Sequence, residues 1–362
     1  MRLIICGDFS RRKDEKDFSI ERIGEIFNDV TDIIKDSDRA IVNVECALTE
    51  RDEPIKKIGP NLKASPCSAE VLKAAGFTDC TLSNNHIMDF GIKGAEDTIK
   101  ALSDNGLSYT GFGADYEDSR KNLVISKDGK TVTVINVCEH EYCYALNNRM
   151  GTRPFDVFDT IHDIRQAKKE SDYVIVIYHG GKEQSVYPSP RLRKTCKAMA
   201  DNGADVILCQ HSHCIGCYEM YNGAHILYGQ GNFCFTATTD VHPHWKTGLI
   251  VRLDIAEKAE IKFIPVNTVG SGIELSKGSM YDETMATLKK QSENLHNGKW
   301  LEGWKDFCRE YAGGYISAVK NAYSDAADEK DNELFAHHMR CEAHHDVWDE
   351  IFKLSWETRK RP

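Results

Sequence analysis

The sequence lacks an apolar run long enough to cross a membrane. A membrane-spanning helix needs about 20 predominantly apolar residues, and no stretch of this 362-residue chain approaches that length. Residues 1–6 form too short an apolar stretch for a signal peptide, and no small-residue cleavage site follows them. We therefore expect a cytoplasmic protein without a membrane segment.

The chain also lacks an excess of positive charge. It contains 46 Lys and Arg against 56 Asp and Glu, which gives a formal net charge of -10. Nucleic-acid binding requires a basic face, so this balance argues against a nucleic-acid partner. It does not exclude a local cationic pocket, and bound divalent ions would offset part of the negative charge. The sequence makes no prediction about the oligomeric state.

Cysteine is abundant rather than scarce, but its pattern does not predict a disulfide framework. The 13 cysteines are odd in number and scattered, several of them in or beside apolar runs. Buried thiols behave as small hydrophobic side chains, so we expect reduced core cysteines. Cys214 and Cys217 form a single C-x-x-C pair, which is weak evidence for zinc without a second pair.

Short β-branched runs separated by helical stretches predict an α/β domain with buried parallel strands. Five such runs lie at residues 3–6, 40–44, 79–82, 173–177 and 205–208. Further strands are expected at residues 131–137, 224–228, 249–255 and 261–266. Apolar spacing and capping signals predict helices at residues 20–36, 65–75, 93–105, 158–169 and 192–202.

The pattern changes near residue 275, where strand signals disappear and charge rises. Helices are predicted at residues 281–291, 300–311, 315–324 and 332–354. We therefore divide the chain into an α/β domain, residues 1–274, and a helical extension or cap, residues 275–362.

Two side-chain patterns in this extension need an interpretation. Trp300, Trp304 and Phe307 share one helical face, and such a stripe is more typical of packing than of a cofactor site. His338 and His345 would share a face of the last predicted helix. Two histidines alone make a poor ligand set, so a second metal site there is the weaker alternative.

Seven acidic, amide and imidazole side chains lie at or just beyond the ends of the five apolar runs. They are Asp8, Glu45, Asn85, His86, His179, His211 and His213. In open α/β sheets, ligands bind at the carboxyl ends of the strands. Mixed oxygen and nitrogen ligands favour manganese, iron or zinc over calcium or magnesium. We therefore expect a site for two divalent ions, which would activate water and stabilise a phosphate transition state.

The order of the motifs is more specific than their composition. The blocks are Gly7-Asp8, Asn43-Val44-Glu45, Ser83-Asn84-Asn85-His86 with Asp89, Tyr178-His179-Gly180-Gly181 with Glu183, Gln210-His211-Ser212-His213, and Tyr228-Gly229-Gln230-Gly231-Asn232-Phe233. Together they resemble the bacterial capsule-synthesis or poly-γ-glutamate-synthesis family known as CapA, a branch of the calcineurin-like metallophosphoesterases. The resemblance covers about residues 1–270 and implies a four-layer αββα sandwich.

The resemblance also implies which side chains hold the two ions. Asp8 and His213 would bind the first ion, and Glu45 would bridge both ions. The second ion would be bound by Asn85, His179 and His211.

Other residues would serve the substrate. His86 would stabilise or protonate the leaving-group oxygen, and Asp89 would orient the His86 imidazole. Glu183 and Asn232 would lie at the rim or behind the ligands. His242 and His244 follow the Asn232 loop and are candidates for the substrate entrance.

The sequence departs from the phosphoesterase pattern at several points. Asp8 is followed by Phe9-Ser10 rather than by the D-x-H histidine, and Glu45 replaces the usual bridging Asp, so the first ion is expected to be held more weakly. Gly180 stands where relatives often have Trp and is expected to leave more room. Because secreted relatives carry a membrane anchor that this chain lacks, we do not expect a direct role in surface polymer export.

The sequence therefore favours a metal-dependent, phosphoesterase-type hydrolase that acts on an anionic small-molecule or polymer substrate. One alternative is an enzyme or accessory protein that acts on γ-glutamyl polymer or peptide, by amide hydrolysis, ligation or epimerisation. Another is a noncatalytic binding module that docks through the helical extension. A cationic pocket would favour an anionic substrate, and its candidate residues are Arg149, Arg153, Lys182, Arg191 and Arg193.

Overall fold

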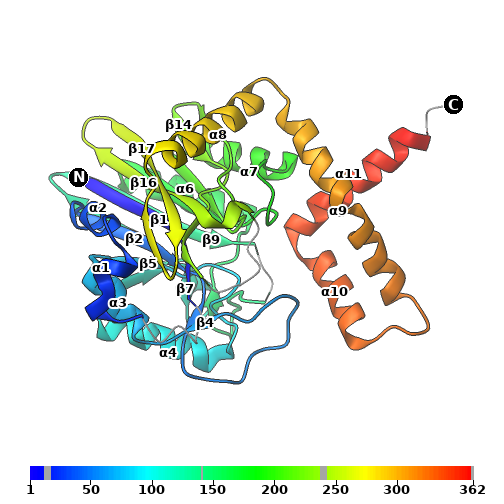
Figure 1. Ribbon diagram of the computed structural model, residues 1–362, viewed down its shortest axis with the longest axis horizontal. Helices are drawn as coiled ribbons and strands as arrows, with labels where there is room; N and C mark the ends of the chain where they lie inside the picture. The colour runs from blue at the N-terminus through cyan, green and yellow to red at the C-terminus, as the bar shows by residue number, and fades with distance from the viewer. Residues whose placement is uncertain (12–17, 140–141, 237–242, 360–362) are drawn as a thin grey trace.

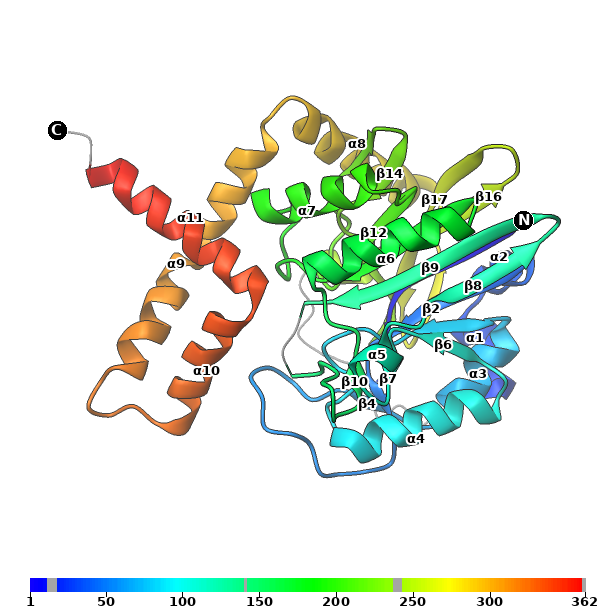
Figure 2. The same cartoon turned by 180° about the vertical axis from the view of Figure 1, so that it is seen from behind.

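Two β-sheets packed face to face form the body of the protein, and a helical extension stands beside them (Figures 1 and 2). The computed structural model describes residues 1–11, 18–139, 142–236 and 243–359. Helices cover the outer face of each sheet, so the layers run helix, sheet, sheet, helix. The predicted four-layer αββα sandwich with a C-terminal helical extension is confirmed.

The first sheet has the strand order β18-β17-β16-β1-β2-β5-β6, and β15 also pairs with β1. Its strands are β1 (Arg2–Ser10), β2 (Arg39–Val44), β5 (Asp79–Thr81), β6 (Ser108–Thr110), β15 (Asn232–Phe235), β16 (Thr247–Ile255), β17 (Ala259–Val269) and β18 (Gly272–Leu275). The strands β1, β2, β5 and β6 run parallel, as predicted, whereas β16 to β18 add an antiparallel edge. Its outer face is covered by α1 (Ile23–Ile26), α2 (Val30–Lys35), α3 (Ser68–Ala75) and α4 (Gly91–Asp104).

The second sheet has the strand order β13-β14-β12-β11-β9-β8. Its strands are β8 (Leu123–Lys127), β9 (Lys130–Cys138), β11 (Tyr173–His179), β12 (Val206–Gln210), β13 (Tyr218–Tyr221) and β14 (Ala224–Leu227). The four central strands are parallel, and β8 and β13 close the edges as antiparallel hairpins. The helices on this side are α6 (Val157–Glu170), α7 (Pro190–Asp201) and α8 (Gly278–His296).

Short elements connect these layers. They are η1 (Ile20–Arg22), β3 (Ala47–Leu48), β4 (Lys63–Ala64), β7 (Phe112–Gly113), α5 (Tyr116–Ser119), β10 (Gly151–Thr152) and η2 (Pro243–Lys246).

The central strands are apolar throughout because both of their faces are buried. In β1, Leu3 and Ile5 point into the space between the sheets, whereas Ile4 and Cys6 join the core under the first layer of helices. In β11, Ile175 likewise belongs to the core between the sheets. Successive strand side chains point to opposite faces, so a strand covered on both sides appears as a continuous apolar run.

Helix boundaries near the N-terminal end differ from the prediction. The single helix expected at residues 20–36 is divided into η1, α1 and α2. Asn28 has a left-handed φ of 41°, which interrupts the helix between α1 and α2. The helix expected to start at Ser65 begins instead at Ser68, and no side chain caps it.

From here on the name helical extension is kept for α9 (Trp300–Ala322), α10 (Glu329–Arg340) and α11 (Glu342–Arg359), because α8 packs against the second sheet although it lies beyond residue 274. Two helices were expected at residues 300–324, but α9 continues through Gly313 and Gly314. One helix was expected at residues 332–354, but the chain is extended at Cys341, with ψ of 125°, and two helices result. His338 and His345 therefore lie on different helices and do not share a face.

A small core of its own holds the extension together. Trp304, Tyr315 and Trp348 pack in one cluster, and Phe307 stacks on Trp304 with 5.8 Å between ring centroids. Trp300 packs instead into the core under the second sheet. The aromatic stripe is thus packing, as predicted.

The structure also tests the expectations about disulfides and membrane-spanning helices. All 13 cysteines are free, and each except Cys67 is buried. Among the described residues, no helix is long and apolar enough to span a bilayer.

One ion pair docks the extension onto the sandwich. Arg191 Nε at the start of α7 donates to Asp346 Oδ1 of α11 at 2.9 Å, and Ser189 Oγ donates to Asp346 Oδ2 at 2.6 Å. The Asp346 side chain is only 9% exposed. Losing a hydrogen-bonded charge partner at such a site costs more than losing one at the surface.

We expect Asp346→Ala to lower the free energy of opening α11 by about 2–3 kcal/mol, measured by hydrogen–deuterium exchange. The matched control is Asp349→Ala in the same helix. Asp349 pairs with Lys353 at 2.5 Å, but the two side chains are 67% and 56% exposed. The control should change the opening free energy by less than about 1 kcal/mol. Equal effects of the two variants would contradict the docking role of Asp346.

Candidate metal centre

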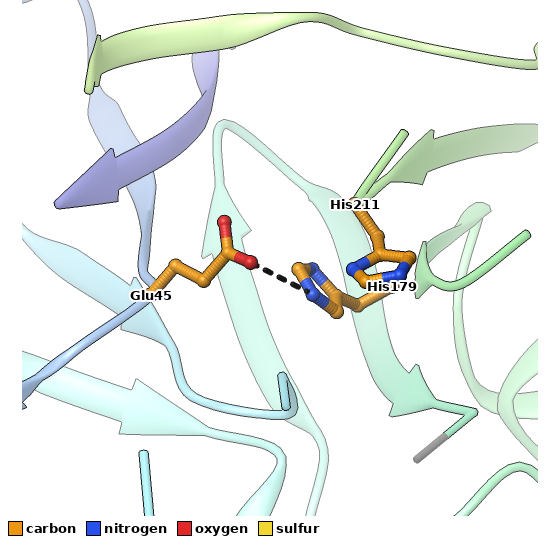
Figure 3. Close-up of side chains that lie close together, drawn as sticks. All are labelled: Glu45, His179 and His211. Carbon is orange, nitrogen blue, oxygen red and sulfur yellow. Dashed lines mark ion pairs between the residues drawn. The ribbon is translucent and has the colours of Figure 1, made fainter. Parts of the chain in front are cut away.

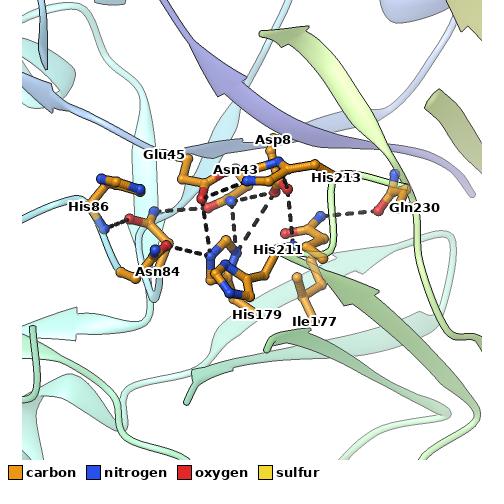
Figure 4. Close-up of polar contacts among 12 residues, drawn as sticks. Asp8, Asn43, Glu45, Asn84, His86, Ile177, His179, His211, His213 and Gln230 are labelled. Atoms are coloured by element: carbon orange, nitrogen blue, oxygen red, sulfur yellow. Dashed lines mark hydrogen bonds and ion pairs between the residues drawn. The ribbon is translucent and has the colours of Figure 1, made fainter. Parts of the chain in front are cut away.

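The predicted site residues converge where the carboxyl ends of the two sheets meet (Figure 4). The first sheet contributes Asp8 within β1, Glu45 directly after β2, and Asn85 after β5. The second sheet contributes His179, the last residue of β11, and the pair that follows β12. Neither sheet alone could form the cluster, so the site depends on the packing of one sheet against the other.

The turn after β12 holds both of its histidines in left-handed backbone conformations. His211 has φ of 84° and His213 has φ of 55°. Such conformations are disfavoured for residues with a Cβ atom and concentrate at functional sites. The His211 backbone N–H donates to Asp8 Oδ2 at 3.0 Å, so one predicted ligand fixes the turn that carries two others.

Three groups of side chains place their ligand atoms within 4.8 Å of one another and could hold a metal ion. They are Asp8, Glu45 and His213; Glu45, His179 and His211; and Glu183, His211 and His213. Glu45 is common to the first two groups. Its Oε1 lies 3.3 Å from His179 Nε2 (Figure 3) and 3.9 Å from His213 Nε2.

Asn85 lies beside the second of these groups. Its Oδ1 is 2.9 Å from His179 Nε2, within reach of the same ion. Glu183, expected at the rim or behind the ligands, lies among the potential ligands and is half-buried.

Burying the two carboxylates at the centre costs free energy unless a cation offsets their charge. Asp8 and Glu45 are both fully buried. Burial, followed by the charge of Glu45, raises the pKa of Asp8 to about 6. Burial likewise raises the pKa of Glu45, and neither Glu45 carboxylate oxygen has a hydrogen-bond partner among the described residues. A divalent ion would satisfy those oxygens, so the residues present fit a metal.

His179 is suited to bind metal as a neutral ligand. It is fully buried, and burial lowers its pKa to about 4. At neutral pH the imidazole therefore carries a lone pair, which is the form that coordinates a metal.

The hydrogen bonds of Asn232 fix the tautomer of His213. Asn232 Nδ2 donates to the Trp245 carbonyl at 3.0 Å, so Asn232 Oδ1 faces His213 Nδ1 as an acceptor at 2.7 Å. His213 Nδ1 must then carry the hydrogen, which leaves Nε2 with a lone pair directed toward a ligand position. Burial lowers the pKa of His213, but Glu45 and Asp8 outweigh it and the net shift is upward.

Two asparagines connect the strand ends. Asn43 Nδ2 donates to Asp8 Oδ1 at 2.7 Å, and Asn84 Nδ2 donates to Asn43 Oδ1 at 3.0 Å. Asn84 Oδ1 accepts the backbone N–H groups of His86 and Ile87, each at 3.0 Å. The turn that presents Asn85 and His86 is therefore tied to the predicted ligand Asp8 (Figure 4).

His86 stands apart from the ligand groups and contacts Asp89. Its Nδ1 lies 2.6 Å from Asp89 Oδ2, so Nδ1 carries the hydrogen and donates it to the carboxylate. Lys57 Nζ forms an ion pair with Asp89 Oδ1 and lies 3.1 Å from His86 Nδ1. Lys57 was not expected at the site, because it lies in a segment without periodic pattern.

A cavity of about 200 Å³ opens beside the cluster. One side is formed by residues of the sandwich, namely Asn85, His86, Glu183 and His211, and Lys57 and Lys182 lie at its edges. The opposite side is formed by α10 and α11, through residues Leu334, His337, His338, Cys341, Ala343 and His344.

Four of the five expected pocket cations are engaged elsewhere. Arg153 is buried and pairs with Asp163 at 2.5 Å, and Arg149 donates to the Tyr144 carbonyl. Arg191 pairs with Asp346 and Arg193 with Glu219. Lys182 is the one of the five that lines the cavity.

Two further expectations need correction or comment. His244 is exposed in η2 and does not line the cavity, and His242 falls outside the described residues. Gly180 does not leave extra room, because a Cβ atom there would lie 2.5 Å from Glu139 Oε2. Glu139 accepts the Gly181 backbone N–H at 2.7 Å and occupies that space.

The structure is thus a four-layer αββα sandwich with Asp, Glu and His side chains gathered at the carboxyl ends of its strands. Comparison with known families identifies the family of the protein. The family described as "Bacterial capsule synthesis protein PGA_cap" matches residues 2–237, more than half of the chain. The protein belongs to this family.

Curated relatives agree with this assignment. The chain is 31% identical to the capsule biosynthesis protein CapA of Bacillus anthracis, over 64% of this chain and 59% of the relative. It is 34% identical to the PGA biosynthesis protein CapA of Bacillus subtilis, over 58% of this chain and 56% of the relative. The chain thus matches a little more than half the length of these relatives.

Solved structures with similar folds are more distant in sequence. A putative 5'-nucleotidase from Staphylococcus aureus, in complex with alpha-ketoglutarate, has a TM-score of 0.47 at 14% identity, over 80% of this chain and 58% of that chain. A hypothetical protein from Thermus thermophilus has a TM-score of 0.46 at 14% identity, over 74% of this chain and 100% of that chain.

Replacing Glu45 should show two effects separately: the free-energy cost of burying its carboxylate without metal, and its contribution to metal binding. A carboxyl group whose folded pKa is raised destabilises the fold once pH exceeds its ordinary value of 4.5, and the penalty disappears below that pH. We therefore expect chelator-treated Glu45→Gln to be more stable than the wild type at pH 7.5, by about 1–3 kcal/mol in urea unfolding, but not at pH 4.

The same substitution should weaken metal binding. Elemental analysis at pH 7.5 should find less bound manganese in Glu45→Gln than in the wild type, because the residue common to two ligand groups has lost its charge. Glu50→Gln, at an exposed site, is the control and should behave as the wild type. Full metal content in Glu45→Gln would contradict the role of Glu45.

Proposed function

We propose that this protein is a metal-dependent hydrolase of the phosphoesterase type that uses two divalent ions, manganese, iron or zinc. The observation that carries the proposal is the position of Glu45, which is common to two adjacent ligand groups. A carboxylate shared in this way is the expected bridge of a two-metal site.

The ligand groups suggest how the ions would be shared out. Asp8 and His213 would hold one ion with Glu45, and Asn85, His179 and His211 would hold the other with Glu45. Glu183 is close enough to His211 and His213 to contribute as well. The bound ions would lower the pKa of a water molecule and stabilise charge on the oxygens of a phosphate.

His86 is the residue we assign to the leaving group. Asp89 accepts the Nδ1 hydrogen and sets the ring orientation, so Nε2 is the atom available to a substrate in the cavity. A proton held at Nε2 would be donated to the departing oxygen, a step that contributes about 10²–10⁴-fold to hydrolysis. Lys57 balances the charge of Asp89 and thereby acts as a positioning residue.

A second candidate function is action on a γ-glutamyl polymer or peptide. It is favoured by the names of the relatives, a PGA biosynthesis protein and a probable polyglutamine synthesis accessory protein from Mycobacterium tuberculosis that is 26% identical over 59% of this chain and 58% of the relative. The same ions that polarise a phosphate would polarise an amide carbonyl.

The two candidates are separated by assay of the manganese-loaded protein on p-nitrophenyl phosphate, its bis ester and γ-glutamyl-p-nitroanilide. We expect phosphate ester hydrolysis, with kcat lowered about 10²–10⁴-fold in His86→Gln and metal content unchanged. His162→Gln, an exposed histidine on α6, is the control and should keep full activity.

Other outcomes of the assay decide against the proposal. Hydrolysis of the γ-glutamyl amide alone would favour the second candidate. A fully loaded protein that hydrolyses none of these substrates, nor any phosphate in a broad panel, would instead favour a noncatalytic role.

A further inference from the structure

The helical extension forms one wall of the cavity beside the metal centre. His337 and His338 of α10, and His344 at the start of α11, line it across from Asn85 and His86. Tyr142 of the sandwich stacks on His337 with 5.6 Å between ring centroids, so the two walls are in direct contact. A substrate held at the metal centre would therefore meet side chains of the extension.

Lys182 of the sandwich and His338 of α10 both line the cavity and can donate hydrogen bonds. Among the described residues, Lys182 forms no ion pair or side-chain hydrogen bond, although its charge acts on the neighbouring Glu183. The charge of Lys182 also acts on His338, which is 6% exposed and whose Nδ1 lacks a hydrogen-bond partner among the described residues. Glu183, the neighbouring carboxylate, is grouped with His211 and His213 on the metal side.

A series of buried charged groups connects the helical extension to the loop that carries Lys182. Asp346 of α11 pairs with Arg191, and Arg191 Nη2 pairs with Glu139 at 2.5 Å. Glu139 in turn accepts the backbone N–H of Gly181, next to Lys182. The docking of the extension and the position of the Lys182 loop are thus coupled, so the groups that line the cavity are pre-organised.

The size of the cavity limits what it can hold. Its volume is about 200 Å³. Pockets for drug-sized ligands are about 300–1,000 Å³. The space fits a small molecule or one terminal unit of a chain.

We propose that Lys182, His337 and His338 form an anion subsite, which binds a second negatively charged group of a small substrate while the metal centre binds the first. The protein would then select compact substrates with two anionic ends, or the anionic terminus of a chain, over neutral-tailed phosphates. The proposal rests on the phosphoesterase function for the metal end, but the subsite itself can be tested by binding alone.

The test uses phosphonates, which bind like phosphates but are not hydrolysed. The full-length, manganese-loaded protein is titrated calorimetrically with ω-carboxyalkyl phosphonates of increasing length and with n-alkyl phosphonates of the same lengths. We expect the best carboxylated ligand to bind about tenfold or more tightly than its alkyl counterpart, because a charge-assisted hydrogen bond is worth about that factor.

Two lysine variants locate the effect. Lys182→Met should reduce the advantage of the carboxylated ligand to about twofold or less. Lys320→Met, which removes the same charge from an exposed position in α9, should keep it. His337→Gln should also weaken the carboxylated ligand selectively, and circular dichroism should give wild-type spectra for all three variants.

The outcomes keep the two proposals apart. Equal binding of the two ligand series, binding of neither, or equal effects of Lys182→Met and Lys320→Met would overturn the anion subsite. Selective binding of the carboxylated series without hydrolysis of any phosphate ester would instead support the subsite and count against the phosphoesterase proposal.

Discussion

The burial of two carboxylates side by side is the constraint on which the rest of this site depends. Asp8 and Glu45 lie at neighbouring strand ends of one sheet, fully buried, and burial raises the pKa of each. Such an arrangement is stable only if positive charge is brought to it. The histidines that accompany the pair come from the other sheet, and the one whose pKa is lowered, His179, is neutral. The packing of the two sheets therefore brings together the side chains that could hold a cation.

Much of this arrangement could be predicted from sequence. Strands buried on both faces appear as continuous apolar runs, so β1, β2, β5, β11 and β12 were located, and the polar residues at their carboxyl ends converge in space. Apolar periodicity predicted helix boundaries less well where the backbone conformation of single residues or tertiary packing determines them. It missed the break at Asn28, and it placed an interruption at residues 312–314, where packing of Trp304 and Tyr315 keeps α9 continuous.

The parts that could not be predicted depend on contacts between distant segments. Lys57 lies in an irregular loop, and its pairing with Asp89 follows only from the folded chain. Arg191, expected to face the substrate, is instead held between Glu139 and Asp346, 155 residues further along the chain. The ion pair between Arg191 and Asp346 also attaches the helical extension to the sandwich. The cavity wall that the extension forms could therefore not be predicted from the sequence either.

A bridging role for Glu45 between two metal ions can be measured by anomalous diffraction at the manganese edge, from crystals grown with manganese. We expect two anomalous peaks roughly 3.5–4 Å apart, both within bonding distance of the Glu45 carboxylate. A single peak, or peaks that leave Glu45 uncoordinated, would contradict it.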